Sequence, residues 1–105
     1  MEVKELITVN FENVIKAQKL VIVDFYADWC GPCKMLSPVI ANMANEFPNI
    51  NFYKVNVDRE SVLARKMNIQ SIPTVMFYKQ GQLVNQFAGY KNPQEIKTII
   101  SNFLK

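Results

Sequence analysis

The segment Leu20–Tyr26 constrains the fold of this chain more than any other part of the sequence. Its residues are apolar or aromatic except for Asp24. Successive side chains of a strand point to opposite faces, so a strand that is apolar on both faces must be covered on both. The sequence therefore predicts an α/β protein whose central sheet has helices on both sides.

Hydrophobic periodicity predicts the other elements around this central strand. Asn10 and Asp58 are each expected to cap the helix that follows, and Pro38 is expected to kink the helix in which it lies. In chain order, the elements are a strand over residues 5–9, a short helix after Asn10, the central strand, a helix over 32–47, a strand over 51–57, a helix over 58–67, strands over 74–78 and 83–88 joined by a hairpin with Gly81 in its turn, and a C-terminal helix.

The C-terminal helix has the clearest start signal. Asn92 stands at the N-cap, Pro93 takes the first helical position and Glu95 completes a capping box. The apolar positions of the helices are expected to face the core. They are Phe11, Val14 and Ile15; Met35, Val39, Ile40, Met43 and Phe47; Met67; and Ile96, Ile99, Ile100, Phe103 and Leu104.

The order of these elements predicts a mixed sheet in one domain that spans residues 1–105. A strand–helix–strand unit gives parallel strands, whereas the hairpin gives antiparallel ones. A chain of 105 residues is long enough for one hydrophobic core. The sequence contains no Pro/Gly/Ser-rich linker and no internal repeat.

Composition and charge exclude several classes of function. The net charge of +3 comes from scattered lysines, whereas a nucleic-acid-binding protein concentrates its basic residues on one face. No apolar run approaches the roughly 18 residues that a membrane span needs. Residues 1–5 lack the basic and apolar regions of a secretory signal, so we expect a cytosolic protein.

Cys30 and Cys33 are the only cysteines, and they lie directly before or within the start of a predicted helix. Zinc needs about four ligands, and the chain has no histidine, so zinc could bind only between two chains. A structural disulfide across so short a loop would stabilise the fold only slightly. A redox-active pair that alternates between dithiol and disulfide is the favoured interpretation.

Cys30 is expected to be the exposed and readily ionised thiol, because it precedes the helix N-terminus. Unpaired backbone N–H groups and the positive end of the helix dipole favour a thiolate there. The dipole alone contributes about 0.3–1 kcal/mol, so hydrogen bonds to sulfur should supply the rest. Cys33 is expected to be the more buried thiol and to resolve a mixed disulfide at high effective concentration.

The segment around these cysteines resembles the active-site segment of the thioredoxin family. The similarity covers nearly the whole chain, and its ordered landmarks are far more specific than a bare cysteine pair. They are residues 23–34 (Val-Asp-Phe-Tyr-Ala-Asp-Trp-Cys-Gly-Pro-Cys-Lys), Pro38, residues 54–58 (Lys-Val-Asn-Val-Asp), residues 71–74 (Ser-Ile-Pro-Thr), Gly81 and Gly89. The resemblance implies the thioredoxin fold, a three-layer α/β/α structure with a five-stranded mixed sheet and four flanking helices.

The resemblance also implies a role for each residue of the site. Cys30 would attack a client disulfide and Cys33 would resolve the mixed disulfide. Asp24 would be the buried carboxylate that accepts the proton of Cys33, with Lys54 beside it, and Pro73 would be a cis-proline that faces the disulfide. The surface that binds the client, with Ile72 pairing through its backbone, would comprise Trp29, Gly31, Pro32, Ile72, Gly89 and Tyr90.

The residues alone leave an alternative open for several of these roles. Asp24 could lie at a wet strand edge, although an Asp buried in an apolar run should have a raised pKa. Lys54 could be a solvated strand lysine. Pro73 could be an ordinary trans-proline, and Trp29 could be an isolated surface aromatic.

Two residues depart from the family pattern. Tyr26 stands where many relatives carry a second tryptophan, so Trp29 should be the sole indole that reports the redox state. Tyr90 follows Gly89 where relatives often have a smaller residue, which could alter the preference for clients.

The function that the resemblance implies is general reduction of protein disulfides in the cytoplasm, contributing to cell redox homeostasis. No cofactor would be bound, because NADPH and flavin belong to the partner, a thioredoxin reductase. Clients would be oxidised proteins such as ribonucleotide reductase, peroxiredoxin and methionine sulfoxide reductase. The protein would be a monomer that binds no metal, nucleic acid or membrane.

Two rival functions remain open at this point. An oxidant or isomerase of the same fold often carries a histidine between its cysteines, whereas this chain has Gly31 and Pro32 there and no histidine, which favours a reducing couple. A non-enzymatic module could also use the surface around Trp29 to hold a partner.

Overall fold

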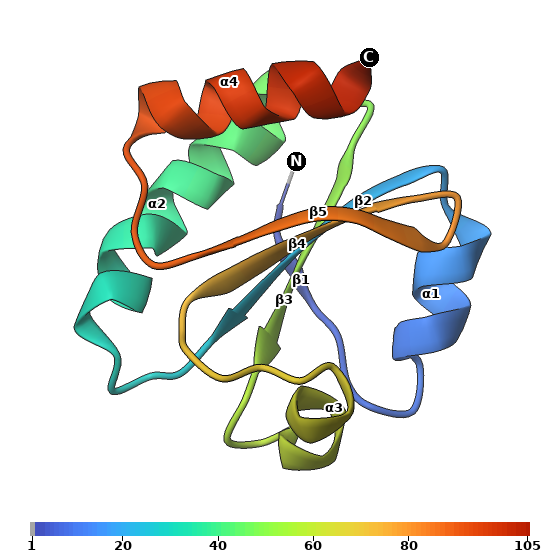
Figure 1. The fold of residues 1–105 in the computed structure, drawn as a ribbon, viewed down its shortest axis with the longest axis vertical. Helices are drawn as coiled ribbons and strands as arrows, with labels where there is room; N and C mark the ends of the chain where they lie inside the picture. Colours follow the sequence, from blue (N-terminus) through green and yellow to red (C-terminus); the bar gives the residue numbers. More distant parts are fainter. Residues whose placement is uncertain (1) are drawn as a thin grey trace.

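The computed structural model describes residues 2–105 and places β2, the central strand of the sequence, in the middle of a sheet (Figure 1). The elements are β1 (Lys4–Glu5), α1 (Phe11–Ala17), β2 (Leu20–Tyr26), α2 (Gly31–Glu46), β3 (Asn51–Asn56), α3 (Ser61–Lys66), β4 (Thr74–Lys79), β5 (Gln82–Ala88) and α4 (Pro93–Leu104). None of the helices within residues 2–105 is long and apolar enough to cross a membrane.

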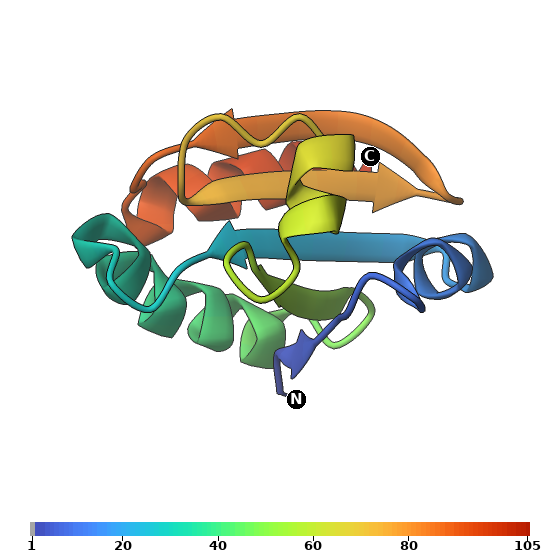
Figure 2. The same ribbon diagram turned by 90° about the horizontal axis from the view of Figure 1, so that it is seen from below.

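The five strands form one mixed sheet in the order β1-β3-β2-β4-β5 (Figure 2). β1 and β2 both run parallel to β3. The chain crosses over through α1 between β1 and β2 and through α2 between β2 and β3. β4 is antiparallel to β2, and β5 is antiparallel to β4 across the hairpin. The predicted mixed sheet is therefore confirmed.

Each face of the sheet has its own core and its own pair of helices (Figures 1 and 2). α2 and α4 cover one face, where they pack on Ile22 of the central strand. α1 and α3 cover the other face, where they pack on Val21, Val23 and Phe25. This alternation along β2 is the physical reason for the three-layer architecture, since a strand that is apolar on both faces requires both layers.

The first strand is shorter than the sequence predicts. Lys4 and Glu5 are in register with β3, and the Leu6 N–H adds one hydrogen bond to the Lys54 carbonyl oxygen at 2.9 Å. The predicted strand over 5–9 is therefore wrong. The Asn10 side-chain oxygen accepts a hydrogen bond from the Ile7 N–H at 3.1 Å, which turns the chain away from the sheet. Asn10 consequently makes no side-chain cap on α1, contrary to the prediction.

Asp58 does not cap the third helix either. The Asn56 side-chain oxygen accepts hydrogen bonds from the backbone N–H groups of Asp58 and Arg59 at 2.9 and 3.1 Å. This turn delays the start of α3 to Ser61, and the side chain of Asp58 bonds to Trp29 instead. Asn56, at the end of β3, thus stabilises the turn before α3, where the sequence predicted a cap by Asp58.

Two predicted core residues lie on the surface. The side chain of Met35 is 59% exposed, whereas its neighbour Leu36 is fully buried, because Leu36 is the residue in line with Ile40 and Met43 on the helix face that contacts the sheet. Leu104, the last residue of α4, is 42% exposed. The other predicted core positions are buried or half-buried.

The hairpin between β4 and β5 is tighter than predicted. β4 continues to Lys79 and β5 begins at Gln82, which leaves Gln80 and Gly81 as the loop. Their φ angles are 51° and 83°, as in the two-residue turns that match the twist of antiparallel strands. The predicted glycine in the turn is confirmed.

The capping box of α4 is present as predicted. The Asn92 side chain accepts a hydrogen bond from the Glu95 N–H at 2.9 Å, and the Glu95 carboxylate accepts one from the Asn92 N–H at 3.0 Å. α4 closes one core through Ile96, Ile100 and Phe103. Its start therefore contributes to global stability.

We expect Asn92→Ala to lower the free energy of unfolding by about 1 kcal/mol, because the N–H of Glu95 loses its acceptor. Urea denaturation monitored by far-UV circular dichroism measures this change. Asn92→Ser is the matched control, since serine retains an acceptor at the same position and should keep most of the stability. An equal loss in both variants would show that the cap does not stabilise α4.

Candidate active site

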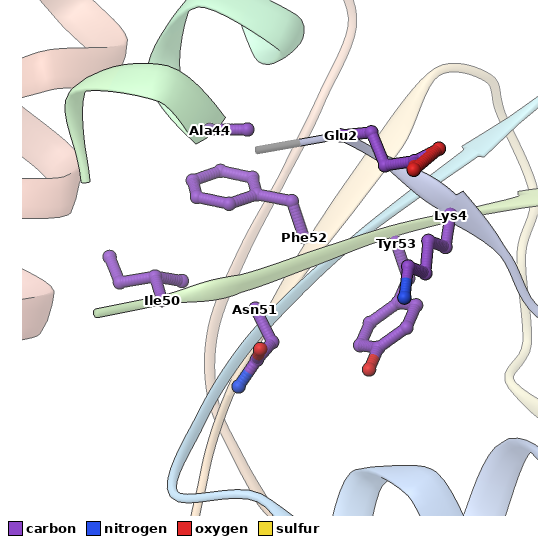
Figure 3. Close-up of a pocket in the computed structure, with 7 residues that line it drawn as sticks. All are labelled: Glu2, Lys4, Ala44, Ile50, Asn51, Phe52 and Tyr53. Atoms are coloured by element: carbon purple, nitrogen blue, oxygen red, sulfur yellow. The ribbon is translucent and has the colours of Figure 1, made fainter. Parts of the chain in front are cut away.

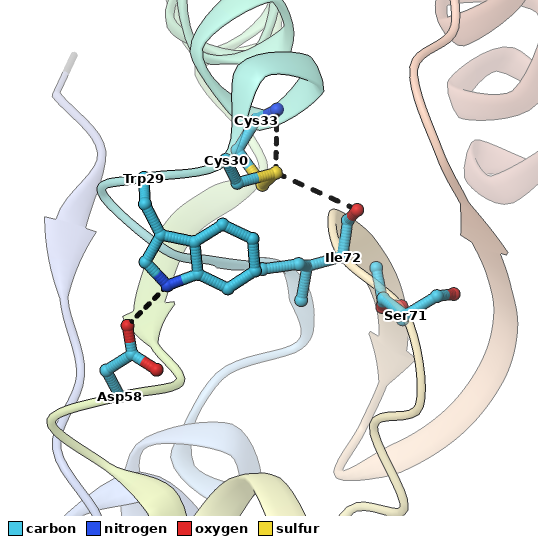
Figure 4. Close-up of a disulfide and its surroundings, with 7 residues drawn as sticks. Trp29, Cys30, Cys33, Asp58, Ser71 and Ile72 are labelled. Atoms are coloured by element: carbon cyan, nitrogen blue, oxygen red, sulfur yellow. Dashed lines mark hydrogen bonds between the residues drawn. A yellow bond between two sulfur atoms is a disulfide. The ribbon is translucent and has the colours of Figure 1, made fainter.

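A disulfide between Cys30 and Cys33 lies at the N-terminus of α2 (Figure 4). Cys30 is the N-cap residue, and its Sγ accepts a hydrogen bond from the Cys33 N–H at 3.2 Å. Pro32 occupies the first turn, where a missing N–H costs nothing. The predicted position of Cys30 before a helix start is confirmed, and one of the orphan N–H groups of the helix points at its sulfur.

The surroundings of Cys30 differ from the prediction in one respect. Cys30 is 4% exposed and Cys33 is 3% exposed, so the expectation of an exposed first sulfur is wrong for this oxidised form. Cys30 packs against Ala27 and Ile72, and its Sγ lies 3.8 Å from the Ile72 carbonyl oxygen. Neither cysteine sulfur projects from the surface, so a client disulfide must lie in close contact with this surface to reach Cys30.

Asp24 is buried, in agreement with the expectation from the apolar run around it. Only 4% of the residue is exposed, and its Oδ1 atom has no hydrogen-bond partner. Burial raises the pKa of this carboxyl to about 7, although the positive charge of Lys54 acts in the opposite direction. The wet-edge alternative for Asp24 is therefore excluded, and the group can gain or lose a proton near neutral pH.

Asp24 and Cys33 line one cleft of about 410 Å³, together with Lys54. Asp24 projects from the central strand, whereas Cys33 comes from the first turn of α2 above the same face of the sheet. The cleft brings a carboxyl group that titrates near neutrality to the same space as the second cysteine. It provides room for water between the two groups.

Lys54 is the direct neighbour of Asp24 in the sheet. The two residues are in register between β3 and β2. The Nζ atom of Lys54 lies 5.8 Å from the centroid of the Tyr26 ring, within the range of a cation–π contact. Lys54 is thus half-buried beside Asp24 and an aromatic face, which disfavours the alternative of a fully solvated lysine.

Pro73 is buried, and the Ile72–Pro73 peptide bond is cis. The Pro73 carbonyl oxygen accepts a hydrogen bond from the Gly89 N–H at 2.8 Å. This bond joins the start of β4 to the residue after β5. Gly89 has a φ angle of +86°, a conformation that favours glycine, and Tyr90, which follows it, is 40% exposed.

Trp29 is the most conspicuous aromatic residue on the surface, because 70% of it is exposed. Its indole N–H donates a hydrogen bond to Asp58 at 2.8 Å, which holds the ring over an adjacent groove (Figure 4). The groove has a volume of about 320 Å³ and is lined by Trp29, Val57, Ser61, Ala64, Arg65, Ile69, Gln70, Ser71 and Ile72. A tethered indole beside an apolar groove disfavours the alternative of an isolated surface aromatic.

The structure therefore brings most of the predicted site residues to one end of the sheet. Gly31 and Pro32 are exposed on the first turn of α2, next to the disulfide. Sequence reasoning missed the role of Asp58 as the partner of Trp29, and it gave no role to Glu5 and Arg59, which line the cleft of Asp24. No local pattern signals these residues, since they reach the site through strand register and a turn.

One further pocket lies away from the disulfide and from Asp24. A pocket of about 280 Å³ lies at the β1 edge of the sheet, between β3 and the end of α2 (Figure 3). It is lined by Glu2, Lys4, Ala44, Ile50, Asn51, Phe52 and Tyr53. Within residues 2–105, no group of three or more histidine, cysteine or acidic residues is arranged to hold a metal ion.

Comparison with known proteins agrees with this geometry. The family model described as thioredoxin matches residues 2–102. Thioredoxin-1 of Saccharomyces cerevisiae is 42% identical over 92 residues, which cover 88% of each chain. The solved structure of Plasmodium falciparum thioredoxin superposes with a TM-score of 0.89 at 38% identity and covers 95% of this chain and 98% of that one.

A further solved structure comes from a study of the thiol-resolving mechanism of yeast mitochondrial 1-Cys peroxiredoxin through the glutathione and thioredoxin systems. Its matching chain has a TM-score of 0.88 and 32% identity, and the match covers 95% of this chain and 94% of that one.

Proposed function

Since this chain belongs to the thioredoxin family and is a thiol-disulfide oxidoreductase, we propose that it works as a general reductant of protein disulfides. The observation that carries the proposal is the placement of Cys30 Sγ. It accepts the Cys33 N–H at the start of α2 and lies against the Ile72 carbonyl, beside the groove of Trp29. A client segment that pairs with the Ile72 backbone would hold its disulfide over this sulfur.

In the first step, the Cys30 thiolate attacks one sulfur of the client disulfide. The client S–S bond breaks, a mixed disulfide forms between Cys30 and the client, and the second client sulfur leaves as a thiolate that takes up a proton. The helix N-terminus stabilises the attacking thiolate. The client-binding surface would comprise Trp29, Gly31, Pro32, Ile72, Gly89 and Tyr90, with the cis-proline Pro73 facing the disulfide.

In the second step, Cys33 resolves the mixed disulfide. Its thiol gives a proton to Asp24, and the resulting thiolate attacks the Cys30 sulfur. The mixed disulfide breaks, the Cys30–Cys33 disulfide forms, and the remaining client sulfur leaves as a thiolate that takes up a proton, so that the client is released as a dithiol. Asp24 suits this role because its pKa lies at about 7 and it shares a cleft with Cys33. Lys54 stabilises the charged carboxylate in that cleft.

The partners follow from the two halves of the cycle. A thioredoxin reductase would return the protein to the dithiol with electrons from NADPH, which pass through the flavin of that enzyme. Oxidised clients such as ribonucleotide reductase, methionine sulfoxide reductase and peroxiredoxin would consume the dithiol. The structural match from the study of a yeast peroxiredoxin and the thioredoxin system supports a client of the last kind.

The setting of the reaction is also part of the proposal. We place the protein in the cytoplasm, where a disulfide is usually catalytic or redox-sensing. Residues 1–105 would act as a single thioredoxin domain and as a monomer, because one chain supplies the disulfide, the cleft and the groove. None of these roles requires nucleic acid or a membrane.

The reductant function has a direct test. With NADPH, a thioredoxin reductase and insulin, we expect the protein to couple NADPH oxidation to cleavage of the insulin disulfides. A redox titration should give a reduction potential more negative than about −200 mV. Thioredoxin, which is a reference case for reducing dithiols, also lies below this value.

The control is the double variant Cys30→Ser/Cys33→Ser, which should have no activity in the coupled assay. A potential above about −200 mV would instead favour the oxidant or isomerase. Full activity of the double variant in cells would favour a binding module that uses the surface without redox chemistry.

A further inference from the structure

Three side chains from separate parts of the chain form a polar cluster at the wall of the Asp24 cleft. The Tyr26 hydroxyl donates a hydrogen bond to Glu5 at 2.6 Å. Arg59 Nη2 lies 3.5 Å from the same carboxylate oxygen and 3.5 Å from the Tyr26 hydroxyl. We call Glu5, Tyr26 and Arg59 the Tyr26 cluster, and all three residues line the cleft that Asp24 shares with Cys33.

Lys54 lies between two carboxylates in the sheet. Its register partner in β1 is Glu5, and its register partner in β2 is Asp24. Neighbouring strands are about 4.8 Å apart, so the ammonium group can pair with either carboxylate. The Tyr26 ring faces the Lys54 Nζ at 5.8 Å, while the hydroxyl of the same ring reaches Glu5.

We propose that Tyr26 is a positioning residue for proton transfer between Asp24 and Cys33, because its hydroxyl, with Arg59, engages Glu5 and thereby keeps the Lys54 ammonium beside Asp24. The inference rests on the proposed role of Asp24 in resolution. Glu5 competes with Asp24 for one cation, and the Tyr26 cluster supplies Glu5 with donors of its own. The ring of Tyr26 also lies within cation–π range of the Lys54 ammonium, at 5.8 Å.

The hydrogen bond from the Tyr26 hydroxyl to Glu5 persists across the working pH range. Burial, together with the hydrogen bond to Glu5, raises the pKa of Tyr26 to about 12, so the hydroxyl remains a donor. The Arg59 contacts are weaker, since the Arg59 side chain is 61% exposed and its distances to Glu5 and Asp28 are 3.5 and 4.0 Å. Tyr26 is therefore the residue on which the arrangement depends.

Among the charged groups around Asp24, Lys54 is the one whose charge lowers the pKa of that carboxyl. β4 presents the uncharged Val75 in register with Asp24. The remaining titratable or charged residues that line the two clefts beside Asp24 are Glu2, Asp28, Cys33 and Lys34. Of these, Asp28 already accepts a hydrogen bond from Asn56 and pairs with Arg59.

The test is a carbon-13 NMR titration of the Asp24 carboxyl in the oxidised protein, which needs no catalytic step. In Tyr26→Phe the aromatic ring remains, but Glu5 loses the Tyr26 hydroxyl and keeps only the weaker Arg59 contact, so Glu5 draws Lys54 away from Asp24. We expect the pKa of Asp24 to rise by about 0.3–1 unit, part of the 1–3 units that an adjacent opposite charge supplies. An unchanged pKa would overturn the inference.

Two variant backgrounds test whether Glu5 acts on Asp24 through Lys54 or by direct repulsion between the two carboxylates. In a Glu5→Gln background, adding Tyr26→Phe should leave the pKa of Asp24 unchanged, because there is no competing carboxylate. In a Lys54→Met background, the same addition should also have no effect. A full-sized rise in the Lys54→Met background would show that Glu5 acts on Asp24 directly and would overturn the role of Lys54.

Tyr53→Phe is the matched control, since it removes a hydroxyl from the residue before Lys54. Tyr53 points to the opposite face of the sheet, where its hydroxyl accepts a hydrogen bond from Gln18 at 2.7 Å. This variant should leave the pKa of Asp24 unchanged. An equal rise in both variants would show that any loss of a phenol near the sheet perturbs Asp24.

Kinetics then separate the inference from the proposed function. The pH midpoint of the resolution rate should rise in Tyr26→Phe together with the carboxyl titration, and Asp24→Asn should remove that midpoint. If the Tyr26→Phe titration shifts but Asp24→Asn keeps the wild-type pH profile, the positioning of Lys54 stands and the proton acceptor role of Asp24 fails. If only the Asp24→Asn result holds, the inference fails and the proposed function stands.

Discussion

Replacing Cys33 with serine is expected to convert the protein into a covalent trap for its clients. Cys30 remains able to attack, but the mixed disulfide loses the thiol that resolves it. Turnover in the insulin assay should fall by about a thousandfold or more. The reason is that a well-oriented intramolecular group can act at an effective concentration of about 10⁵ M or higher. Non-reducing gels and mass spectrometry of the trapped adducts measure the outcome.

The matched variant is Cys30→Ser, which should trap almost no client. The structure supports this asymmetry, since Cys30 Sγ receives the Cys33 N–H and lies against the Ile72 carbonyl, whereas Cys33 opens into the cleft of Asp24. Adducts formed mainly through Cys33 would exchange the two roles. Similar trapping by both variants would mean that the helix N-terminus does not select the attacking sulfur.

Replacing Asp24 with asparagine is expected to stabilise the protein at alkaline pH. The folded-state pKa of Asp24 lies at about 7, above its value of 3.8 in an unfolded chain, so the folded state holds the proton more tightly. Well below pH 3.8 the group is neutral in both states and has no effect. Between the two pKa values the carboxyl ionises in the unfolded chain while the folded state still holds the proton, so stability falls as the pH rises. The loss reaches about 4 kcal/mol above pH 7, where the buried carboxyl is ionised as well.

Urea denaturation at pH 4, 6 and 8.5 tests this prediction in wild type and Asp24→Asn. The gain in the free energy of unfolding should be smallest at pH 4, larger at pH 6 and largest at pH 8.5. Asp28→Asn is the matched control, because the Asp28 side chain lines the same cleft but is 75% exposed and should contribute little at any pH. An equal gain from Asp24→Asn at all three pH values would contradict a burial effect on ionisation.

The burial of Asp24 lowers the stability of the fold but makes its carboxyl group suitable for proton transfer. A buried carboxylate without a hydrogen-bond partner on Oδ1 weakens the fold at neutral pH and above. The same burial gives the group a pKa at which it can exchange a proton with a thiol. Residues that carry function commonly have such a cost.

Much of the fold could be predicted from local patterns. β2 is apolar on both faces, which required helices on both sides of a sheet, and the capping box at Asn92 located the start of α4. The cysteine pair and the landmarks around it located the active site. These signals are strong because each depends on residues that are close together in the chain.

Other predictions failed where a polar side chain had several possible partners. Asn10 and Asp58 have the right chemistry to cap a helix, but Asn10 bonds to Ile7 and Asp58 bonds to Trp29. The burial of Cys30 also depends on Ile72, which comes from a distant part of the chain. Local propensity cannot rank such alternatives, because the competing partner is absent from the local sequence.

Periodicity and spacing act over a few residues, and they were enough to predict the layers of the fold, the dithiol chemistry and the placement of Cys30 before a helix. The row Glu5–Lys54–Asp24 and the contact of Tyr26 with both Glu5 and Lys54 became visible in the folded sheet. Strand register sets that row, and register is a property of the whole sheet, because a shift by one residue would turn every one of these side chains to the opposite face.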